Sequence, residues 1–147
     1  MERYTRAFLD DVYQRLDGLA PDTEPKWGRM RPPQLFAHLA TAVRYGLGKE
    51  PLTPDEGGVF GHHVVAPLIL NGLMKLPKNV KAPKMYDTQL PQASLDDFRV
   101  EADEFLERYN ARSIAPPPHP YFGDVGLEGW CKIHVAHFQH HMRQFGV

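Results

Sequence analysis

The histidines near the C-terminus are the residues of this chain best suited to chemistry. Four of the chain's eight histidines lie in the segment 133–147, which reads IHVAHFQHHMRQFGV. His137 and His141 stand four residues apart, and on a helix this spacing places two side chains on the same face. Two imidazoles in this arrangement can bind one metal ion. Two ligands make an incomplete site, so a third is expected from elsewhere, and the best candidate is His38 in the segment QLFAHLATAV.

Helical rotation directs these histidines toward the interior of the protein. Each residue of an ideal helix advances by ~100°. At this rotation one arc of the last helix holds three histidines and three large aromatic side chains: Trp130, His134, His137, Phe138, His141 and Phe145. His38 likewise shares a face with Leu35 and Leu39. Burying imidazoles costs free energy unless each is hydrogen-bonded or coordinated, and a shared metal ion satisfies several together. The alternative is a set of core histidines with ordinary hydrogen-bond partners.

The remaining histidines fit a metal site less well. His134 and His141 are nearly two turns apart, ~10 Å along the axis, which is too far for one ion with Zn–N distances of roughly 2.0–2.1 Å. We therefore predict that His134 lies in a pocket beside the ligands. His140 points outward, and we expect His62, His63 and His119 at the surface or at a rim.

Three imidazoles without a thiolate suit zinc, nickel, iron or copper. Three protein ligands also leave coordination positions open for water or substrate, as in catalytic zinc sites. Acidic residues are scarce on the inward faces, so no fourth ligand is predicted. Trp27 and Tyr45 are candidates to line the pocket, and Arg143 is a candidate to bind an anionic substrate. Cys131 has no activating base in the sequence and is interpreted as a packing residue.

The elements that must position these residues are helices. Apolar residues recur with helical period, and no segment alternates with period two, so an all-α helical bundle is predicted. The expected helices span about 3–19, 32 to 46 or 48, 94–112 and 127–145. A shorter helix is expected over 62–75, in the long connection between the second and third of these, and 78–92 is expected to be irregular. Proline at 32 and Ser94 mark helix starts.

Composition limits the class of protein. The chain has 147 residues, 42% of them hydrophobic and 24% charged, with a net charge of -1. We expect one soluble domain over 1–147, with neither nucleic acid nor membrane as a partner. The single cysteine excludes an internal disulfide and fits a reducing compartment. Because the N-terminal segment carries charges throughout, no signal peptide is expected, and we predict a cytoplasmic location.

Several motifs resemble a known family. WGRM, RPPQLFAHLA, LPKNVKAP, HPYFG and HFQHHMRQFG occur in this order, and they resemble a DinB-like family of unknown function in the DinB/YfiT superfamily. The resemblance covers about 27–146. It implies a four-helix bundle with up-down-down-up connections. It also implies a metal triad of one histidine from helix two and an HxxxH pair from the last helix, at His38, His137 and His141.

The resemblance also suggests an activity. Some relatives are transferases or isomerases that use mycothiol, bacillithiol or glutathione at the metal. The sequence departs from the family pattern at Gln139, where an Asp is common, and at Arg31, where a Ser, Thr or Asn usually caps helix two. Neither departure touches the implied ligands.

The sequence therefore predicts a metal-dependent enzyme whose divalent ion, zinc or nickel before iron, activates water or a low-molecular-weight thiol. Its reaction would be of the hydrolase or thiol S-transferase type on a small-molecule substrate, with no catalytic residue yet identified. A homodimer is expected. The alternatives are a non-catalytic metal-binding or interaction protein, and a metal-free bundle.

Overall fold

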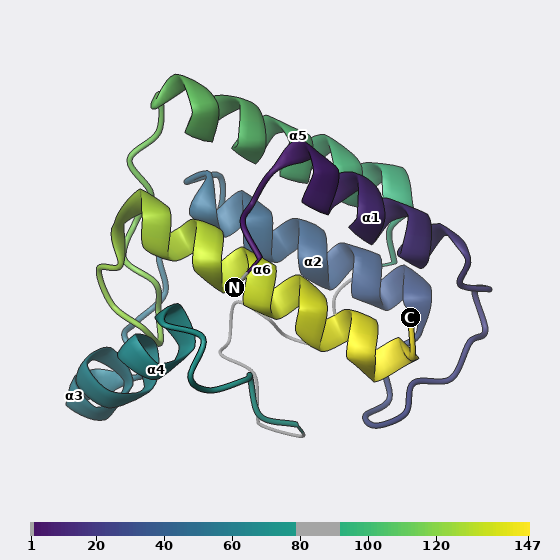
Figure 1. Cartoon of the computed structure of the whole chain (residues 1–147), viewed down its shortest axis with the longest axis horizontal. Helices are drawn as coiled ribbons and strands as arrows, with labels where there is room; N and C mark the ends of the chain where they lie inside the picture. The colour runs from purple at the N-terminus through teal and green to yellow at the C-terminus, as the bar shows by residue number, and fades with distance from the viewer. Residues whose placement is uncertain (1, 79–91) are drawn as a thin grey trace.

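The structure, a computed structural model, describes residues 2–78 and 92–147 (Figure 1). Within these ranges every regular element is a helix and no strand occurs, which confirms the predicted all-α class. The long helices are α1 (Arg6–Asp17), α2 (Pro32–Gly46), α5 (Leu95–Ala111) and α6 (Gly126–Phe145). Most of the segment predicted to be irregular, 78–92, lies outside the described residues.

The helix starts follow from local chemistry. Ser94 caps α5 as predicted: its Oγ accepts from the Asp97 amide at 3.1 Å, and the Asp97 carboxylate accepts from the Ser94 amide at 2.8 Å. Such a reciprocal pair satisfies two amides that the helix itself leaves unbonded. At α2 the N-cap is Arg31, whose side chain offers no acceptor. Only one of the two reciprocal hydrogen bonds is present there: Gln34 Oε1 accepts from the Arg31 amide at 3.0 Å.

The long helices bury their apolar faces against one another. α2 contacts both α5 and α6, and α1 contacts the same two helices. One continuous core lies among them, and its largest fully buried side chains are Trp130, Tyr45, Phe98, Phe105 and Phe138. None of the helices described within 2–78 and 92–147 combines the length and apolar character that crossing a membrane requires.

The connection after α2 forms a short helical arm at the side of the molecule (Figure 1). It comprises α3 (Gly58–Phe60), a π-helical turn η1 (Gly61–Val65) and α4 (Ala66–Leu70). The helix predicted over 62–75 therefore begins earlier and ends earlier. In the π turn the Ala66 amide bonds the Gly61 carbonyl five residues back, directly before Pro67, which has no amide hydrogen to offer.

The arm is fixed to the loop that precedes α6. The Glu56 amide donates to the Pro120 carbonyl at 2.6 Å. A side chain at Gly57 would overlap the Tyr121 carbonyl, so the close approach of the two segments requires glycine there. A second apolar cluster of Ala66, Ile69, Phe122 and Ile133 then joins α4 to α6.

His119 in this loop is buried, so the prediction that it lies at the surface or a rim was wrong. Only 3% of the residue is exposed. Its Nδ1 accepts from the backbone amides of Tyr121 at 3.0 Å and Phe122 at 3.2 Å. The ring packs on Phe122 and Trp130. The loop thus folds inward around an imidazole that accepts hydrogen bonds from the loop's own amides. His62 is half-buried and His63 is exposed, as expected for both.

Candidate metal centre

The structure brings together His38 from α2 with His137 and His141 from α6. The three side chains are buried, with 4%, 8% and 6% of each residue exposed. His38 Nε2 lies 2.9 Å from His137 Nε2, which lies 3.0 Å from His141 Nε2. Among the described residues, these three form a group whose ligand atoms all lie within 4.8 Å of one another. That group holds no carboxylate and no thiolate.

A neighbouring amide determines which nitrogen of His141 carries the proton. Gln144 Nε2 donates to the Trp27 carbonyl at 2.9 Å, and a carbonyl can only accept. Gln144 Oε1 therefore faces His141 Nδ1, at 2.7 Å, and Nδ1 must donate. In the neutral ring this leaves Nε2 of His141 unprotonated, with its lone pair directed at His137.

Hydrogen bonds alone do not account well for the cluster. His137 Nε2 faces both His38 Nε2 and the unprotonated His141 Nε2, but a neutral ring nitrogen offers either one proton or one lone pair. If it donates to His141, it cannot also accept from His38. If it accepts from His38, it carries no proton, and the unprotonated Nε2 atoms of His137 and His141 then face each other without a hydrogen between them. A cation among the three nitrogens would instead accept a lone pair from each of them.

The spacing of the nitrogens fits one ion. Two nitrogens that are each roughly 2.0–2.1 Å from one metal ion lie about 2.9 Å apart at a right angle and about 3.3 Å apart at the tetrahedral angle of zinc sites. The His38–His137 and His137–His141 spacings of 2.9 and 3.0 Å lie at the short end of this range, and all three ligand atoms lie within 4.8 Å of one another. The donor set and its spacing therefore suit a single divalent transition-metal ion.

Burial keeps the three rings neutral. It lowers the pKa of His38 to about 4, with His140 adding a smaller effect. Burial also lowers the pKa of His137 and of His141 well below the usual range, and the neighbouring histidines lower both further. Neutral imidazole is the form that binds metals. At neutral pH no proton has to leave a charged ring before coordination.

His134 lies on α6 one turn before His137, in an aromatic environment. Its ring contacts Tyr4, Phe105, Trp130 and Phe138, and the residue has no exposed surface. Neither ring nitrogen has a hydrogen-bond partner within the described part of the chain. Burial lowers the pKa of His134 to about 3. Its ring thus packs among core aromatics, and its predicted role beside the ligands stays a prediction.

The other candidate pocket residues lie at different places. Trp27 is half-buried at the C-terminal end of α6, where its ring lies 5.6 Å from that of His140 and 4.3 Å from Lys78 Nζ. Tyr45 is buried two turns beyond His38, with its ring 6.0 Å from Trp130 and its hydroxyl 3.3 Å from Thr53 Oγ1. Arg143 is half-buried and, after burial, contributes to the lowered pKa of His140.

Sequence reasoning missed Gln144. The residue is buried, with 5% exposed, and contacts both a cluster histidine and the Trp27 backbone. A signal existed, because Gln144 follows His141 by three residues and therefore shares its helix face. Its second partner lies 117 residues away in the chain, and no local pattern reveals that contact.

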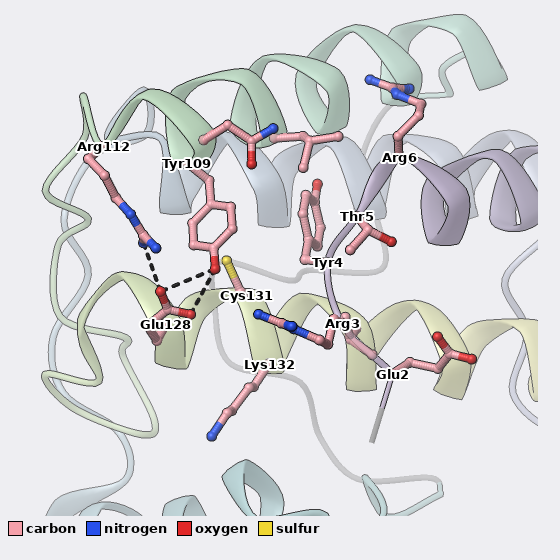
Figure 2. Close-up of a pocket in the computed structure, with 13 residues that line it drawn as sticks. Glu2, Arg3, Tyr4, Thr5, Arg6, Tyr109, Arg112, Glu128, Cys131 and Lys132 are labelled. Carbon is pink, nitrogen blue, oxygen red and sulfur yellow. Dashed lines mark hydrogen bonds and ion pairs between the residues drawn. The ribbon is translucent and has the colours of Figure 1, made fainter.

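A cavity of about 480 Å³ lies elsewhere, between the N-terminal segment, α5 and α6 (Figure 2). Its lining includes Arg3, Tyr109, Glu128 and Cys131 but none of the three clustered histidines. Glu128 is already bound by Arg112 at 2.7 Å and by the Tyr109 hydroxyl at 2.9 Å. Burial raises the pKa of the Cys131 thiol to about 12. This agrees with a packing role for the cysteine and argues against a nucleophile here.

The fold and the cluster together define an all-helical protein with a buried three-histidine group that could hold a metal ion. The chain belongs to the family described as "Protein of unknown function (DUF1569)", whose profile matches residues 5–146. No curated protein and no solved structure matches the chain.

Proposed function

We propose that His38, His137 and His141 bind one divalent transition-metal ion, and that the protein uses this ion to activate water or a low-molecular-weight thiol. The observation that carries the proposal is the convergence of three neutral Nε2 atoms at 2.9 and 3.0 Å, with the proton of His141 held on the opposite nitrogen by Gln144. We expect zinc or nickel, and iron after them, because imidazole suits these metals.

The chain's own residues would each have a distinct task at such a site. His38 anchors it to α2, and the pair on α6 supplies two ligands from one rigid helix. Gln144 orients His141. When bound, a divalent ion supplies Lewis acidity, which lowers the pKa of water or of a thiol at an open coordination position. Three protein ligands leave such positions open, which favours a reaction of the hydrolase or thiol S-transferase type on a small molecule.

We also propose that the fold is a DinB-like four-helix bundle with up-down-down-up connections. The long connection between α2 and α5 and the origin of the three histidines on α2 and α6 support this proposal. A cytoplasmic homodimer acting with a small thiol is part of the same proposal. It can be tested by light scattering for the mass and by the thiol experiment below.

The first experiment is the metal content of the untagged protein, measured by mass spectrometry. Wild type is compared with His38→Ala and His137→Ala, and with His63→Ala as a control because His63 is an exposed histidine outside the cluster. We expect about one ion per chain in wild type and in the control, and none in the other two variants. Wild type without metal after reconstitution, or His137→Ala with full metal content, would contradict the proposal.

A second experiment separates a catalytic site from a non-catalytic metal site. Protein reconstituted with cobalt(II) is titrated with glutathione, and the visible spectrum is recorded. A new thiolate-to-cobalt band would indicate an open position that a thiol can occupy. A spectrum that thiol leaves unchanged, together with four protein ligands by X-ray absorption, would favour the non-catalytic alternative.

A further inference from the structure

Gln144 connects the histidine cluster to the segment 26–28, in which Trp27 lies 117 positions before it in the chain. Its side chain bonds His141 Nδ1 on one side, at 2.7 Å, and the Trp27 carbonyl on the other, at 2.9 Å. Its main-chain carbonyl accepts from the Lys26 amide at 2.7 Å. Gly28 adopts a φ of +78°, and a side chain there would come within 3.0 Å of Gln144 Nε2. The segment therefore fits closely around this one residue.

The position of the Trp27 indole depends on this attachment. The ring is half-buried and lies against His140, with Lys78 Nζ on it. The backbones of Lys26 and Trp27 bond Gln144, and a side chain at Gly28 would crowd the Gln144 amide. A change in the orientation of the Gln144 amide would remove the bond to the Trp27 carbonyl, on the residue that carries the indole, while the Lys26 bond to the main-chain carbonyl would remain.

The same amide determines how His141 presents its Nε2. A ligand histidine usually donates its other ring N–H to an outer partner, and that bond fixes the tautomer and the ring orientation. Gln144 Oε1 occupies this position for His141. The amide cannot turn over to serve His141 differently without directing its oxygen at the Trp27 carbonyl, an acceptor facing an acceptor.

We propose that Gln144 is a positioning residue that couples occupancy of the metal site to docking of the segment 26–28. This inference rests on the proposed function. Metal binding favours the His141 tautomer and orientation that Gln144 supports, and the docked segment favours the Gln144 orientation that supports His141. Because coupling of two equilibria is reciprocal, the metal tightens the docking of Trp27, and the docked segment raises the metal affinity.

Two substitutions at Gln144 separate its two hydrogen bonds. Gln144→Met keeps the length of the side chain and removes both bonds. Gln144→Glu keeps an acceptor for His141 Nδ1 but removes the donor to the Trp27 carbonyl. The matched control is Gln139→Met, because Gln139 is a half-buried glutamine on the same helix.

The readouts are zinc affinity, measured by competition with a chelator, and quenching of tryptophan fluorescence by acrylamide. Trp130 has no exposed surface, so the quenching reports Trp27, and Trp27→Phe verifies this assignment. In wild type and Gln139→Met we expect zinc to reduce the quenching. In Gln144→Met we expect zinc affinity to fall about 10–100-fold and quenching to stay high with or without zinc. In Gln144→Glu we expect quenching to stay high and zinc affinity to fall less than in Gln144→Met, because His141 keeps its acceptor but loses the support of the docked segment.

Failure of this inference can be told apart from failure of the proposed function. If wild type binds no metal, the proposed function fails, and the coupling fails with it. If wild type binds zinc but Gln144→Met binds it equally tightly with the same quenching response, only the coupling is overturned. Nitrogen-15 NMR of the metal-free protein gives an independent check. His141 should carry its proton on Nδ1 in wild type and lose this preference in Gln144→Met, and an unchanged tautomer would overturn the positioning role.

Discussion

His38 Nε2 lies 2.9 Å from His137 Nε2, although 99 positions separate the two residues in the chain. The contact joins α2, the second long helix, to α6, the last one, and both histidines are buried there. If a metal ion occupies this junction, it crosslinks α2 and α6 in the folded state only, and its binding must therefore stabilise the protein.

The first prediction concerns metal and thermal stability. Zinc at a hundred times its dissociation constant should stabilise wild type by about 2.7 kcal/mol, visible as a higher melting temperature in calorimetry. Exhaustive chelation should remove this gain. The effect should disappear in His38→Ala and persist in His63→Ala. A melting temperature that neither zinc nor a chelator changes would favour a metal-free protein with core histidines.

The cluster could be anticipated because its determinants are local. The spacing of four between His137 and His141 and the apolar stripe around His38 are properties of single helices. Helix rotation is enough to predict which of these side chains point inward. The same reasoning placed the long helices within a few residues of their observed bounds.

Contacts between distant segments could not be anticipated in this way. His119 was expected at the surface or a rim because it lies in a loop, yet the loop folds inward and the Tyr121 and Phe122 amides use its ring as their acceptor. The role of Gln144 likewise depends on a carbonyl at Trp27. The π turn before Pro67 lies where Gly57 and Gly61 pack against Tyr121, a contact that no periodicity encodes.

The second prediction concerns pH and uses His119. Burial, then His134, lowers the pKa of His119 from the ordinary 6.5 to about 3 in the folded protein. As the pH falls, the unfolded chain takes up this proton first, so the contribution to stability is complete above pH 6.5 and is lost toward pH 3. His119→Asn should therefore reduce the slope of unfolding free energy against pH by roughly 1 kcal/mol per unit between pH 6 and 5.

This slope is measured by denaturant unfolding at several pH values, with a chelator present so that metal binding does not contribute. Asparagine retains an acceptor for the Tyr121 and Phe122 amides, which limits the overall loss of stability. Gln139→Met is the control, because it removes no titratable group, and its slope should equal that of wild type. Equal slopes for His119→Asn and wild type would mean that His119 titrates normally in the folded protein.

The third prediction concerns Gly46, which leaves room for the His134 ring. A methyl group at this position would lie 3.0 Å from His134 Nε2, 3.2 Å from Trp130 and 3.3 Å from Phe105. These side chains are packed in the core and have little freedom to move. Gly46→Ala should cost about 1–3 kcal/mol of unfolding free energy by overpacking, although alanine is the better helix former.

The control for Gly46 is Gly18→Ala. Gly18 has a φ of -75°, and a methyl group there would meet only the Arg15 carbonyl, at an ordinary 3.6 Å. This substitution should be close to neutral in the same denaturant experiment. If Gly46→Ala were as stable as Gly18→Ala, the packing of His134 against α2 would be looser than the structure indicates.

The fourth prediction concerns the attachment of the helical arm at Gly57. A side chain at this position would overlap the Tyr121 carbonyl, so Gly57→Ala must displace the arm from the loop before α6. The Glu56 bond to Pro120 should be lost with it. The long helices do not need this contact, so we expect faster cleavage within 56–73 in limited proteolysis and little change in helical content by circular dichroism. Gly48→Ala is the comparison. A methyl group at Gly48 meets nothing within 4 Å, and its φ of +76° makes the change strained at the end of α2 without affecting the arm. Equal cleavage of the arm in both variants would show that the contact with Tyr121 does not hold it in place.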